Sequence, residues 1–267
     1  MPEGDTIHQV AAALCPELCG HVVRHVHLKR LNGSNLLGRT ISNVSSKGKH
    51  LFIDFDNGLV LRSHLGMYGA WHRYGLAERW LKPAWQASIV LQTDERVLVC
   101  FNAKEVEILA AHGYRLLDEH RRLGPDLIRD RPDAAVLARR AGELLGPDVP
   151  LADVLLDQRV AAGIGNVYKS EVLFLEGQSP LDRLADTPAK ALQALYRRAE
   201  ELLRRNSQGG PRVTRPVDDG RGRLWVYGRR DRPCLRCGTS IRWARLGVNQ
   251  RVTYWCPRCQ ESSRGRR

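Results

Sequence analysis

Four cysteines near the C-terminus constrain this chain more than any other feature of its sequence. Cys234-x-x-Cys237 and Cys256-x-x-Cys259 are separated by eighteen residues. Each C-x-x-C turn aims two thiolates at one point, and two such turns complete a tetrahedral set of ligands. Four sulfur ligands leave no open position, so we expect one structural zinc ion rather than a catalytic metal. Two disulfides or an iron–sulfur cluster are the alternatives.

The segment between the two cysteine pairs predicts a zinc β-hairpin. IRWARL and NQRVTYWC alternate as two strands, and a unit of about thirty residues is too small to build its own hydrophobic core. Arg242 and Arg245 lie in the first strand and Arg251 in the second. Such arginines are either ordinary solvated side chains or contacts to a polyanion.

The positive charge of the chain is concentrated at the same end. Of a formal net charge of +13, residues 201–267 supply +12, because this segment holds 17 arginines, no lysine and 5 acidic residues. A GC-rich genome explains arginine in place of lysine, but it does not explain an excess at one end. Guanidinium groups form forked hydrogen bonds to phosphate, so we expect a nucleic acid as partner.

The first hundred residues predict an antiparallel sheet that follows one helix. DTIHQVAAAL at 5–14 has apolar residues on one helical face, and short β-branched runs then follow as far as residue 101, with turns at DNG and TDER. Alternation stops at about residue 105. The predicted class is α+β, with an N-terminal sandwich or barrel.

Helical patterns dominate the second half of the chain. LGPDLIRDRPD at 123–133 indicates a linker. The long Gly-rich loop RNSQGGPRVTRPVDDGRGR at 205–223 suggests a functional or partly disordered segment. No stretch approaches the roughly 18 apolar residues of a membrane span. Helices are expected at 134–145, 151–157, 165–176 and 188–205.

A Gly-x-Gly-Asn turn at 163–166 separates two of these helices. Glycines let a ligand approach the backbone, and the N-terminus of the following helix presents free N–H groups and a positive dipole to an anion. A phosphate fits there, although helical hairpins that bind nothing carry the same turn.

The chain begins Met-Pro-Glu. Removal of Met1 exposes the secondary amine of Pro2, which can displace a leaving group at carbon and form an iminium. Taken alone, however, these residues are also an unremarkable start.

Together these segments resemble the formamidopyrimidine-DNA glycosylase and endonuclease VIII family, and the opening residues are closer to its endonuclease VIII branch. The resemblance spans nearly the whole chain in the order of the family. The segments that carry it are MPEG, SKGKHL at 46–51, SHLGMYG at 63–69, LLDQ with AGIGN at 155–166, and the CxxC pairs.

The resemblance implies a bifunctional DNA glycosylase and abasic-site lyase of base excision repair. Pro2 would be the Schiff-base nucleophile and Glu3 the general acid, and Lys49 would contact phosphate and assist proton transfer. Met67 and Tyr68 would fill the gap that the rotated nucleotide leaves. His64 would touch a phosphate, Gly165 and Asn166 would form the clamp of a helix–two-turn–helix motif, and Arg251 would serve both catalysis and phosphate binding.

Two positions depart from the family pattern. The family carries an acid at the sixth residue, where this chain has Thr6 after Asp5. The role of a second carboxylate is therefore open. Gln250 stands where glycine is expected before the finger arginine, so we expect a differently bent hairpin tip.

The expected substrate is DNA with an oxidised base, a pyrimidine rather than a formamidopyrimidine or oxidised guanine, or DNA with an abasic site. We expect a monomeric bacterial cytoplasmic protein with no membrane partner. A catalytically inactive lesion-binding scaffold and an RNA-binding zinc protein are the rivals. The expected divisions are a catalytic sandwich at 2–115, a linker at 116–132, a helical DNA-binding domain at 133–228, a zinc finger at 229–262 and a basic tail at 263–267.

Overall fold

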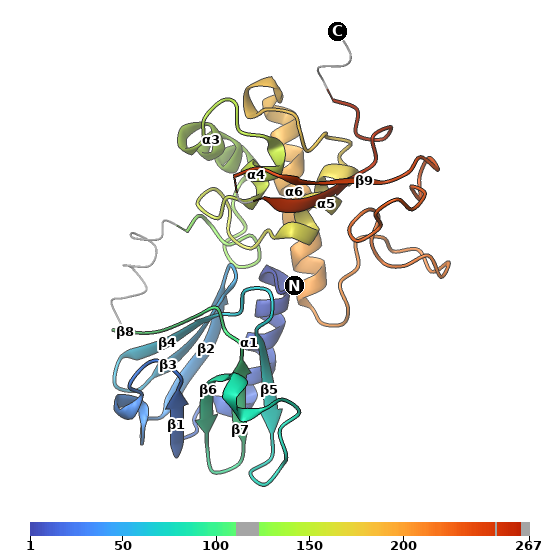
Figure 1. Cartoon of the computed structure of the whole chain (residues 1–267). Coiled ribbons are helices and arrows are strands. Elements are labelled where there is room, and N and C mark those ends of the chain that lie inside the picture. The colour runs from blue at the N-terminus through green and yellow to red at the C-terminus, as the bar shows by residue number, and fades with distance from the viewer. Residues whose placement is uncertain (111–122, 249, 263–267) are drawn as a thin grey trace. The chain divides into compact units, whose positions relative to one another are not determined.

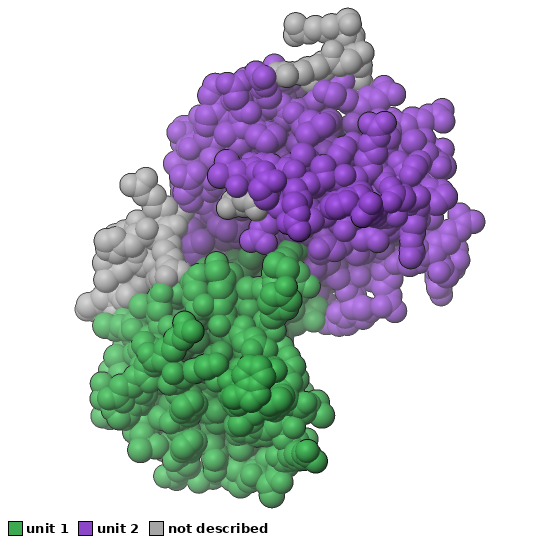
Figure 2. All heavy atoms as spheres, viewed as in Figure 1, with its two compact units in different colours: residues 1–121 green, residues 122–267 purple. Residues whose placement is uncertain are grey.

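The computed structural model describes residues 1–110, 123–248 and 250–262. The chain divides into two compact units, residues 1–121 and residues 122–267 (Figure 2). The first unit holds two antiparallel sheets and a helix, and the second holds helices and a two-stranded hairpin (Figure 1). The predicted α+β class is therefore confirmed.

The sheets of the first unit have four strands each. Their orders are β1-β6-β7-β5 and β2-β3-β4-β8, and neighbouring strands are antiparallel. The bounds are β1 His25–Leu28, β2 Ile41–Lys47, β3 His50–Phe55, β4 Leu59–His64, β5 Ala70–Tyr74, β6 Ala87–Gln92, β7 Val97–Phe101 and β8 Glu105–Ala110.

One apolar cluster joins the two sheets into a sandwich. Leu51 and Leu61 of the second sheet and Ile89 and Leu98 of the first belong to the same buried cluster. Alternate residues of these strands point to the opposite face, as the period of a strand requires. The sandwich supplies a rigid base for the turns at its ends.

The leading helix, α1, spans Gly4–Leu18 and packs on β2. Ile7, Leu14 and Leu18 are buried on one face, which is the apolar periodicity that predicted the helix. The helix extends beyond the predicted 5–14 at both ends and includes Pro16.

Two strands were not predicted from the sequence. β5 and β8 each end a sheet. β5 buries only Tyr74 fully, and β8 has no fully buried residue. The expectation that alternation stops at about residue 105 was therefore wrong, because edge strands need no continuous apolar run.

The second unit contains the helices α3 Ala134–Leu144, α4 Leu151–Leu156, α5 Asn166–Leu175 and α6 Ala189–Ser207. Each predicted helix agrees with one of these within two residues. Leu155, Tyr168 and Leu195 share their buried core with Leu127, which lies in the segment predicted as part of the linker. The linker itself remains a prediction, since residues 111–122 lie outside the described part of the chain.

The strands β9 Arg242–Leu246 and β10 Arg251–Trp255 pair as the predicted antiparallel hairpin. Phe174 of α5 is buried in one cluster with Ile241 and with two of the C-terminal cysteines. The finger therefore packs on the helical part of its own unit. None of the helices in the described ranges is long and apolar enough to cross a membrane.

Candidate active site and metal centre

Pro2 and Glu3 stand immediately before α1. Pro2 is half-buried and Glu3 is fully buried. Glu3 is the extended N-cap residue, and its carbonyl oxygen accepts the backbone N–H of Ile7 at 3.1 Å. This bond starts the helix, so the position of both residues is fixed by α1.

The turn between β2 and β3 carries Lys49. Lys47 pairs with His50 across the hairpin, and Gly48 has a φ of +57°, a conformation that glycine adopts without strain. On the same hairpin, the hydroxyl of Ser46 lies 3.5 Å from Nδ1 of His8 in α1. The structure therefore brings the Lys49 turn beside the helix that begins after Glu3.

His64 ends β4 directly opposite His50, and the two rings lie 4.8 Å apart. Its Nδ1 atom is buried and has no hydrogen-bond partner among the described residues. Burial lowers the pKa of His64 to about 4, and the positive charges of Lys104 and Lys49 lower it too. The imidazole is neutral at physiological pH and can donate only one hydrogen bond.

The turn after His64 presents Met67 and Tyr68. The backbone N–H of Gly69 donates to the carbonyl of Leu65 at 3.0 Å, which closes the turn. Met67 is 52% exposed and Tyr68 75% exposed. Two neighbouring large side chains displayed on a closed turn match what an inserting wedge requires.

An arginine that the sequence analysis missed lies beneath this end of the sheet. Arg62 is fully buried, and its Nη2 atom lies 3.0 Å from Glu105 and 2.8 Å from Glu107. Its Nη1 atom donates to Nδ1 of His50 at 2.6 Å, so neutral His50 carries its proton on Nε2. The residue lies in an apolar strand, and nothing in the pattern distinguishes it from a solvated arginine.

The altered acid position lies in the first turn of α1. Asp5 is buried and accepts a hydrogen bond from the Thr6 hydroxyl at 3.2 Å. The carboxylate is therefore held by its own neighbour in the helix.

In the second unit, hydrogen bonds from the Gln158 side chain hold the glycine turn at 163–166. Gly163 has a φ of +113° and donates its N–H to the Gln158 side chain at 3.1 Å. The Gln158 amide in turn donates to the Ile164 carbonyl at 2.9 Å. Gly165 caps α5 and Asn166 begins it, so the predicted turn and helix start are both present.

Both polar atoms of the Asn166 side chain form hydrogen bonds. Its Nδ2 donates to the Val252 carbonyl of β10 at 2.7 Å, and its Oδ1 accepts from Lys169 at 2.6 Å. An amide nitrogen carries two hydrogens, so one N–H is available beyond the bond to Val252. Val252 follows Arg251, and the structure thus brings the predicted clamp residue next to the finger strand.

Lys169 is a second residue that sequence reasoning missed. It is fully buried, and its ammonium also donates to the Thr253 hydroxyl at 2.7 Å and to the Val252 carbonyl at 3.3 Å. A buried ammonium is costly unless hydrogen bonds satisfy it. Lys169 therefore joins α5 to β10 directly behind Asn166.

Arg251 is exposed at the start of β10, after the tip of the hairpin. Gln250 has a φ of +48°, the left-handed region in which glycine is favoured. Its side chain compensates by donating to the Gly247 carbonyl at 2.9 Å. The Asp153 carboxylate of α4 accepts the Val248 N–H at 3.2 Å, so a helix of the same unit holds the tip.

The cysteine cluster fits one tetrahedral ion. The four sulfurs lie within 4.8 Å of one another, with Cys234 and Cys259 3.9 Å apart and Cys237 and Cys256 3.4 Å apart. Zinc–sulfur bonds of about 2.3 Å place sulfurs about 3.8 Å apart. Backbone N–H groups also approach the Cys234 and Cys256 sulfurs at 3.4 Å, which favours thiolates. These four residues form the site of one structural zinc ion, as predicted.

Glu171 organises the loop that precedes the finger. Its buried carboxylate accepts the N–H groups of Trp225, Val226 and Tyr227 at 2.8 to 2.9 Å and the hydroxyl of Thr214. Burial raises its pKa and these four donors lower it, with burial the larger effect. The middle of the long Gly-rich loop and the residues just after its end are therefore fixed to α5. Sequence reasoning missed Glu171, because acidic residues on helices are normally exposed.

Three family models match the chain in succession. They describe the formamidopyrimidine-DNA glycosylase N-terminal domain over residues 1–106, its H2TH domain over residues 123–215, and the zinc finger found in FPG and IleRS over residues 232–261.

Curated relatives match over the full length. The chain is 41% identical to a probable endonuclease 8 2 of Streptomyces coelicolor, covering 97% of this chain and 94% of the relative. It is 39% identical to the DNA-(apurinic or apyrimidinic site) lyase Nei2 of Mycolicibacterium smegmatis, covering 98% and 100%. It is 30% identical to endonuclease 8 of Escherichia coli, covering 97% and 100%.

Solved structures share the fold. The formamidopyrimidine-DNA glycosylase of Lactococcus lactis, bound to DNA containing an abasic site, superposes with a TM-score of 0.83 at 22% identity, covering 97% of this chain and 100% of that one. MutM of Thermus thermophilus gives 0.81 at 27% identity, covering 98% and 100%. With three domain models in order and relatives of 30 to 41% identity over almost the whole chain, this protein belongs to the formamidopyrimidine-DNA glycosylase and endonuclease VIII family, in its endonuclease 8 branch.

Proposed function

We propose that the chain is a DNA glycosylase and abasic-site lyase of base excision repair that uses Pro2 as its nucleophile. The observation that carries this is the start of α1, where Pro2 precedes a fully buried glutamate and the Lys49 turn lies beside the same helix. The names of the full-length relatives, endonuclease 8 and abasic-site lyase, support the same activity.

The chemistry requires no metal. After removal of Met1, the lone pair of the Pro2 nitrogen attacks C1′ of the damaged nucleotide, and the bond from C1′ to the base breaks as the base leaves with a proton. Glu3 protonates the ring oxygen as the sugar opens, leaving an iminium between Pro2 and C1′. Loss of a C2′ proton expels the 3′ phosphate, and a second elimination expels the 5′ phosphate. Water then hydrolyses the remaining Schiff base and frees Pro2.

The other predicted residues of the first unit hold the substrate for this reaction. Lys49 contacts a phosphate beside the lesion and assists proton transfer. Neutral His64 donates one hydrogen bond to a phosphate, and Met67 and Tyr68 occupy the gap in the stack. Their exposure on a closed turn supports this role, since an exposed apolar pair needs a partner surface.

The second unit holds the DNA backbone. We assign the phosphate clamp to the backbone of Gly165, the second amide hydrogen of Asn166 and the guanidinium of Arg251. The hydrogen bond from Asn166 to Val252 supports this grouping, because it ties the clamp to the strand that carries Arg251. When zinc is bound, it fixes the fold of the finger and takes no part in the reaction.

We further propose that the substrate base is an oxidised pyrimidine, with formamidopyrimidine or oxidised guanine as the alternative. We retain the division into a catalytic domain at 2–115, a linker at 116–132, a DNA-binding domain at 133–228, a finger at 229–262 and a tail at 263–267. Action on bacterial chromosomal DNA by a monomer would place the protein in the cytoplasm.

Strand cleavage tests this proposal. Purified protein is incubated with duplexes carrying an abasic site, thymine glycol or oxidised guanine at one position, and the products are resolved on denaturing gels. The expected products carry phosphates at both ends of a one-nucleotide gap, with thymine glycol cut faster than oxidised guanine. Binding without cleavage of any duplex would leave a lesion-binding scaffold, and preferential retention of RNA would favour an RNA-binding protein.

A further inference from the structure

Two cysteines outside the zinc site lie side by side at the C-terminal end of α1. Cys15 and Cys19 are four residues apart, so they lie on the same face of the helix. Their sulfur atoms are 2.7 Å apart, which is within about 0.7 Å of the length of a disulfide bond. Both are free thiols in this structure. The pair can therefore form a covalent bond with only a small movement.

The backbone at this end of α1 permits that movement. Cys19 is the C-cap residue, with an extended φ of −65° and ψ of 129°, and its N–H donates to the Cys15 carbonyl at 2.8 Å. Pro16 has no N–H, so the last turn lacks one of the usual helical hydrogen bonds. Because Cys19 has left the helical conformation, the two side chains can approach more closely than at the same spacing inside a regular helix.

Both thiols are half-buried at the edge of the core of the sandwich. Leu14 and Leu18, which each precede one of the cysteines, are fully buried and fix this end of the helix. The core therefore holds the two sulfurs together, while their partial exposure lets a small oxidant reach them.

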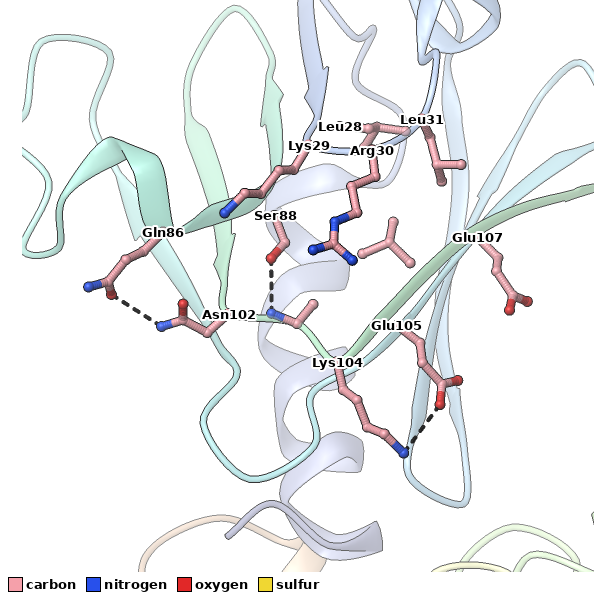
Figure 3. A pocket seen from close by; sticks show the side chains of 12 residues that line it. Leu28, Lys29, Arg30, Leu31, Gln86, Ser88, Asn102, Lys104, Glu105 and Glu107 are labelled. Carbon is pink, nitrogen blue, oxygen red and sulfur yellow. Dashed lines mark hydrogen bonds and ion pairs between the residues drawn. The ribbon is translucent and has the colours of Figure 1, made fainter.

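Cys100 lacks this access. It is fully buried in β7, and burial raises the pKa of its thiol. A pocket of about 590 Å³ in the same unit is lined by Asn102 and Ala103, but Cys100 does not line it (Figure 3). The other four cysteines form the zinc site. All seven cysteines lie in the described ranges, so Cys15 and Cys19 are the accessible thiols outside the zinc site.

The two thiols differ in their chemistry. Burial and the neighbouring Cys15 raise the pKa of Cys19 to about 11. Cys19 therefore keeps its proton at neutral pH and donates it to the Cys15 sulfur. A thiol that keeps its proton is a poor nucleophile, so Cys15 is the sulfur that meets an oxidant first and Cys19 supplies the second sulfur.

We propose that Cys15 and Cys19 form a site of reversible oxidation, at which hydrogen peroxide converts the two thiols to a disulfide at the end of α1. The Cys15 sulfur attacks one peroxide oxygen, the O–O bond breaks, and a sulfenic acid forms as water leaves. The Cys19 sulfur then attacks the Cys15 sulfur, and the S–O bond breaks as the second water leaves with the Cys19 proton. The two thiols lose two electrons, which reduce the peroxide to water.

The neighbouring thiol also protects Cys15 from irreversible oxidation. A sulfenic acid that condenses with a thiol can be reduced again, whereas one that reacts with more peroxide becomes a sulfinic acid. Because the Cys19 sulfur is already in contact, condensation is the faster step. The bond forms at the opposite end of α1 from Pro2 and Glu3, so the inference does not rest on the proposed function.

Peptide mapping tests the site without relying on cleavage of DNA. The zinc-loaded full chain is treated with hydrogen peroxide, alkylated with iodoacetamide in denaturant and digested with trypsin. The tryptic peptide that ends at Arg24 contains Cys15 and Cys19 and no other cysteine. The peptide that follows Arg96 contains Cys100 and serves as the internal control.

The peptide that ends at Arg24 should become lighter by two hydrogens and lose alkylation at least about tenfold, and dithiothreitol should restore both alkylation sites. The Cys100 peptide should not change. Cys19→Ser cannot close the bond, so dimedone, which labels sulfenic acids, should label Cys15 about tenfold more than in the wild type. Ala13→Ser places the same side chain at an exposed position of α1 and should behave as the wild type.

Full alkylation of both cysteines after treatment would overturn the inference, as would oxidation of the zinc cysteines while the pair stays reduced. Equal dimedone labelling of Cys15 in the wild type and in Cys19→Ser would show that Cys19 does not react with the sulfenic acid. A disulfide-linked dimer on a non-reducing gel would contradict a bond within one helix.

Discussion

The two units present their site residues in opposite ways. In the first, Met67 and Tyr68 are exposed on a turn beside the sandwich. In the second, Asn166 is only 7% exposed and is held by Lys169, which is fully buried. The side chains of a wedge must move from water into the stack of DNA bases, so they are exposed in the free protein. A phosphate clamp must already be in position when the phosphate binds. The difference agrees with the proposed division, in which the first unit carries the wedge and the nucleophile and the second carries the phosphate clamp.

Loss of zinc should have the largest effect of the changes considered. It should unfold only the zinc finger of the second unit. Structural zinc contributes about 10 to 16 kcal/mol to the folding of small fingers, so Cys237→Ser should unfold the finger and remove the Arg251 strand from Asn166. We expect at least about a hundredfold loss of DNA affinity. Metal analysis and circular dichroism follow the finger, and anisotropy follows binding.

The first unit should keep its own unfolding transition in the Cys237→Ser protein. Brief treatment with a chelator that leaves the metal in place should not slow cleavage. A chelator that blocks cleavage while zinc remains bound would contradict a purely structural metal.

Lys169→Met tests whether Lys169 orients the Asn166 amide for DNA binding. Replacing the buried ammonium with an apolar side chain of similar length leaves buried acceptors such as Asn166 Oδ1 without this donor, so stability should fall by about 1 to 3 kcal/mol. The change also frees the Asn166 amide from its orientation. DNA affinity should fall about tenfold, which is about 1.4 kcal/mol, while the cleavage rate at saturating DNA is unchanged. Anisotropy and single-turnover kinetics separate the two quantities.

The control is Lys190→Met, which removes the same charge from an exposed position of α6. A reduced cleavage rate at saturating DNA, with unchanged affinity, would show that Lys169 acts in the cleavage reaction. It would contradict the assignment of the second unit to DNA binding alone.

Substitutions of the wedge residues should lower kcat/KM without changing the stability of the fold. Met67→Ala and Tyr68→Ala each remove a side chain that is more than half exposed, so the free energy of unfolding should change by less than about 0.5 kcal/mol. Loss of stacking should lower kcat/KM on duplex DNA about tenfold. Leu81→Ala, at 82% exposure in the same unit, is the matched control and should change neither.

The smallest expected effect is a dependence of stability on pH in the first unit. Unfolded His64 takes up a proton near pH 6.5, whereas the folded residue does so only near pH 4 because burial opposes the charge. The unfolded state therefore binds more protons between these values, and stability falls as pH falls through this window. His64→Gln should flatten the loss of Tm between pH 7 and pH 4.5, and an unchanged slope would show that His64 is not the group responsible.

The sequence predicts features that depend on local patterns, such as apolar periodicity and closely spaced cysteines. It does not predict contacts between residues that are far apart in the chain. Helices such as α5 and α6 follow from apolar periodicity, and the four cysteines predict their own metal site. The edge strands β5 and β8 were missed because half-exposed strands lack an apolar run. Gln250 has the left-handed backbone that glycine favours, and the differently bent hairpin tip stays a prediction.

The candidate site divides in the same manner. Pro2, Lys49, Asn166 and Arg251 could be named from their motifs, although their roles remain proposals. Lys169 could not, because its partner Thr253 lies 84 residues further along the chain. Glu171 and Arg62 were missed for the same reason, since a charged residue looks solvated until distant partners bury it.

Borohydride trapping tests whether Pro2 is the nucleophile. Purified protein is mixed with an abasic-site duplex and reduced, and the cross-linked peptide is identified by mass spectrometry, with Pro2→Gly as control. We expect an adduct at the N-terminal residue of the processed wild-type chain, reduced about a hundredfold or more in the control while DNA binding persists. An adduct on a lysine, or tight binding with no adduct, would contradict the assignment of Pro2 as nucleophile.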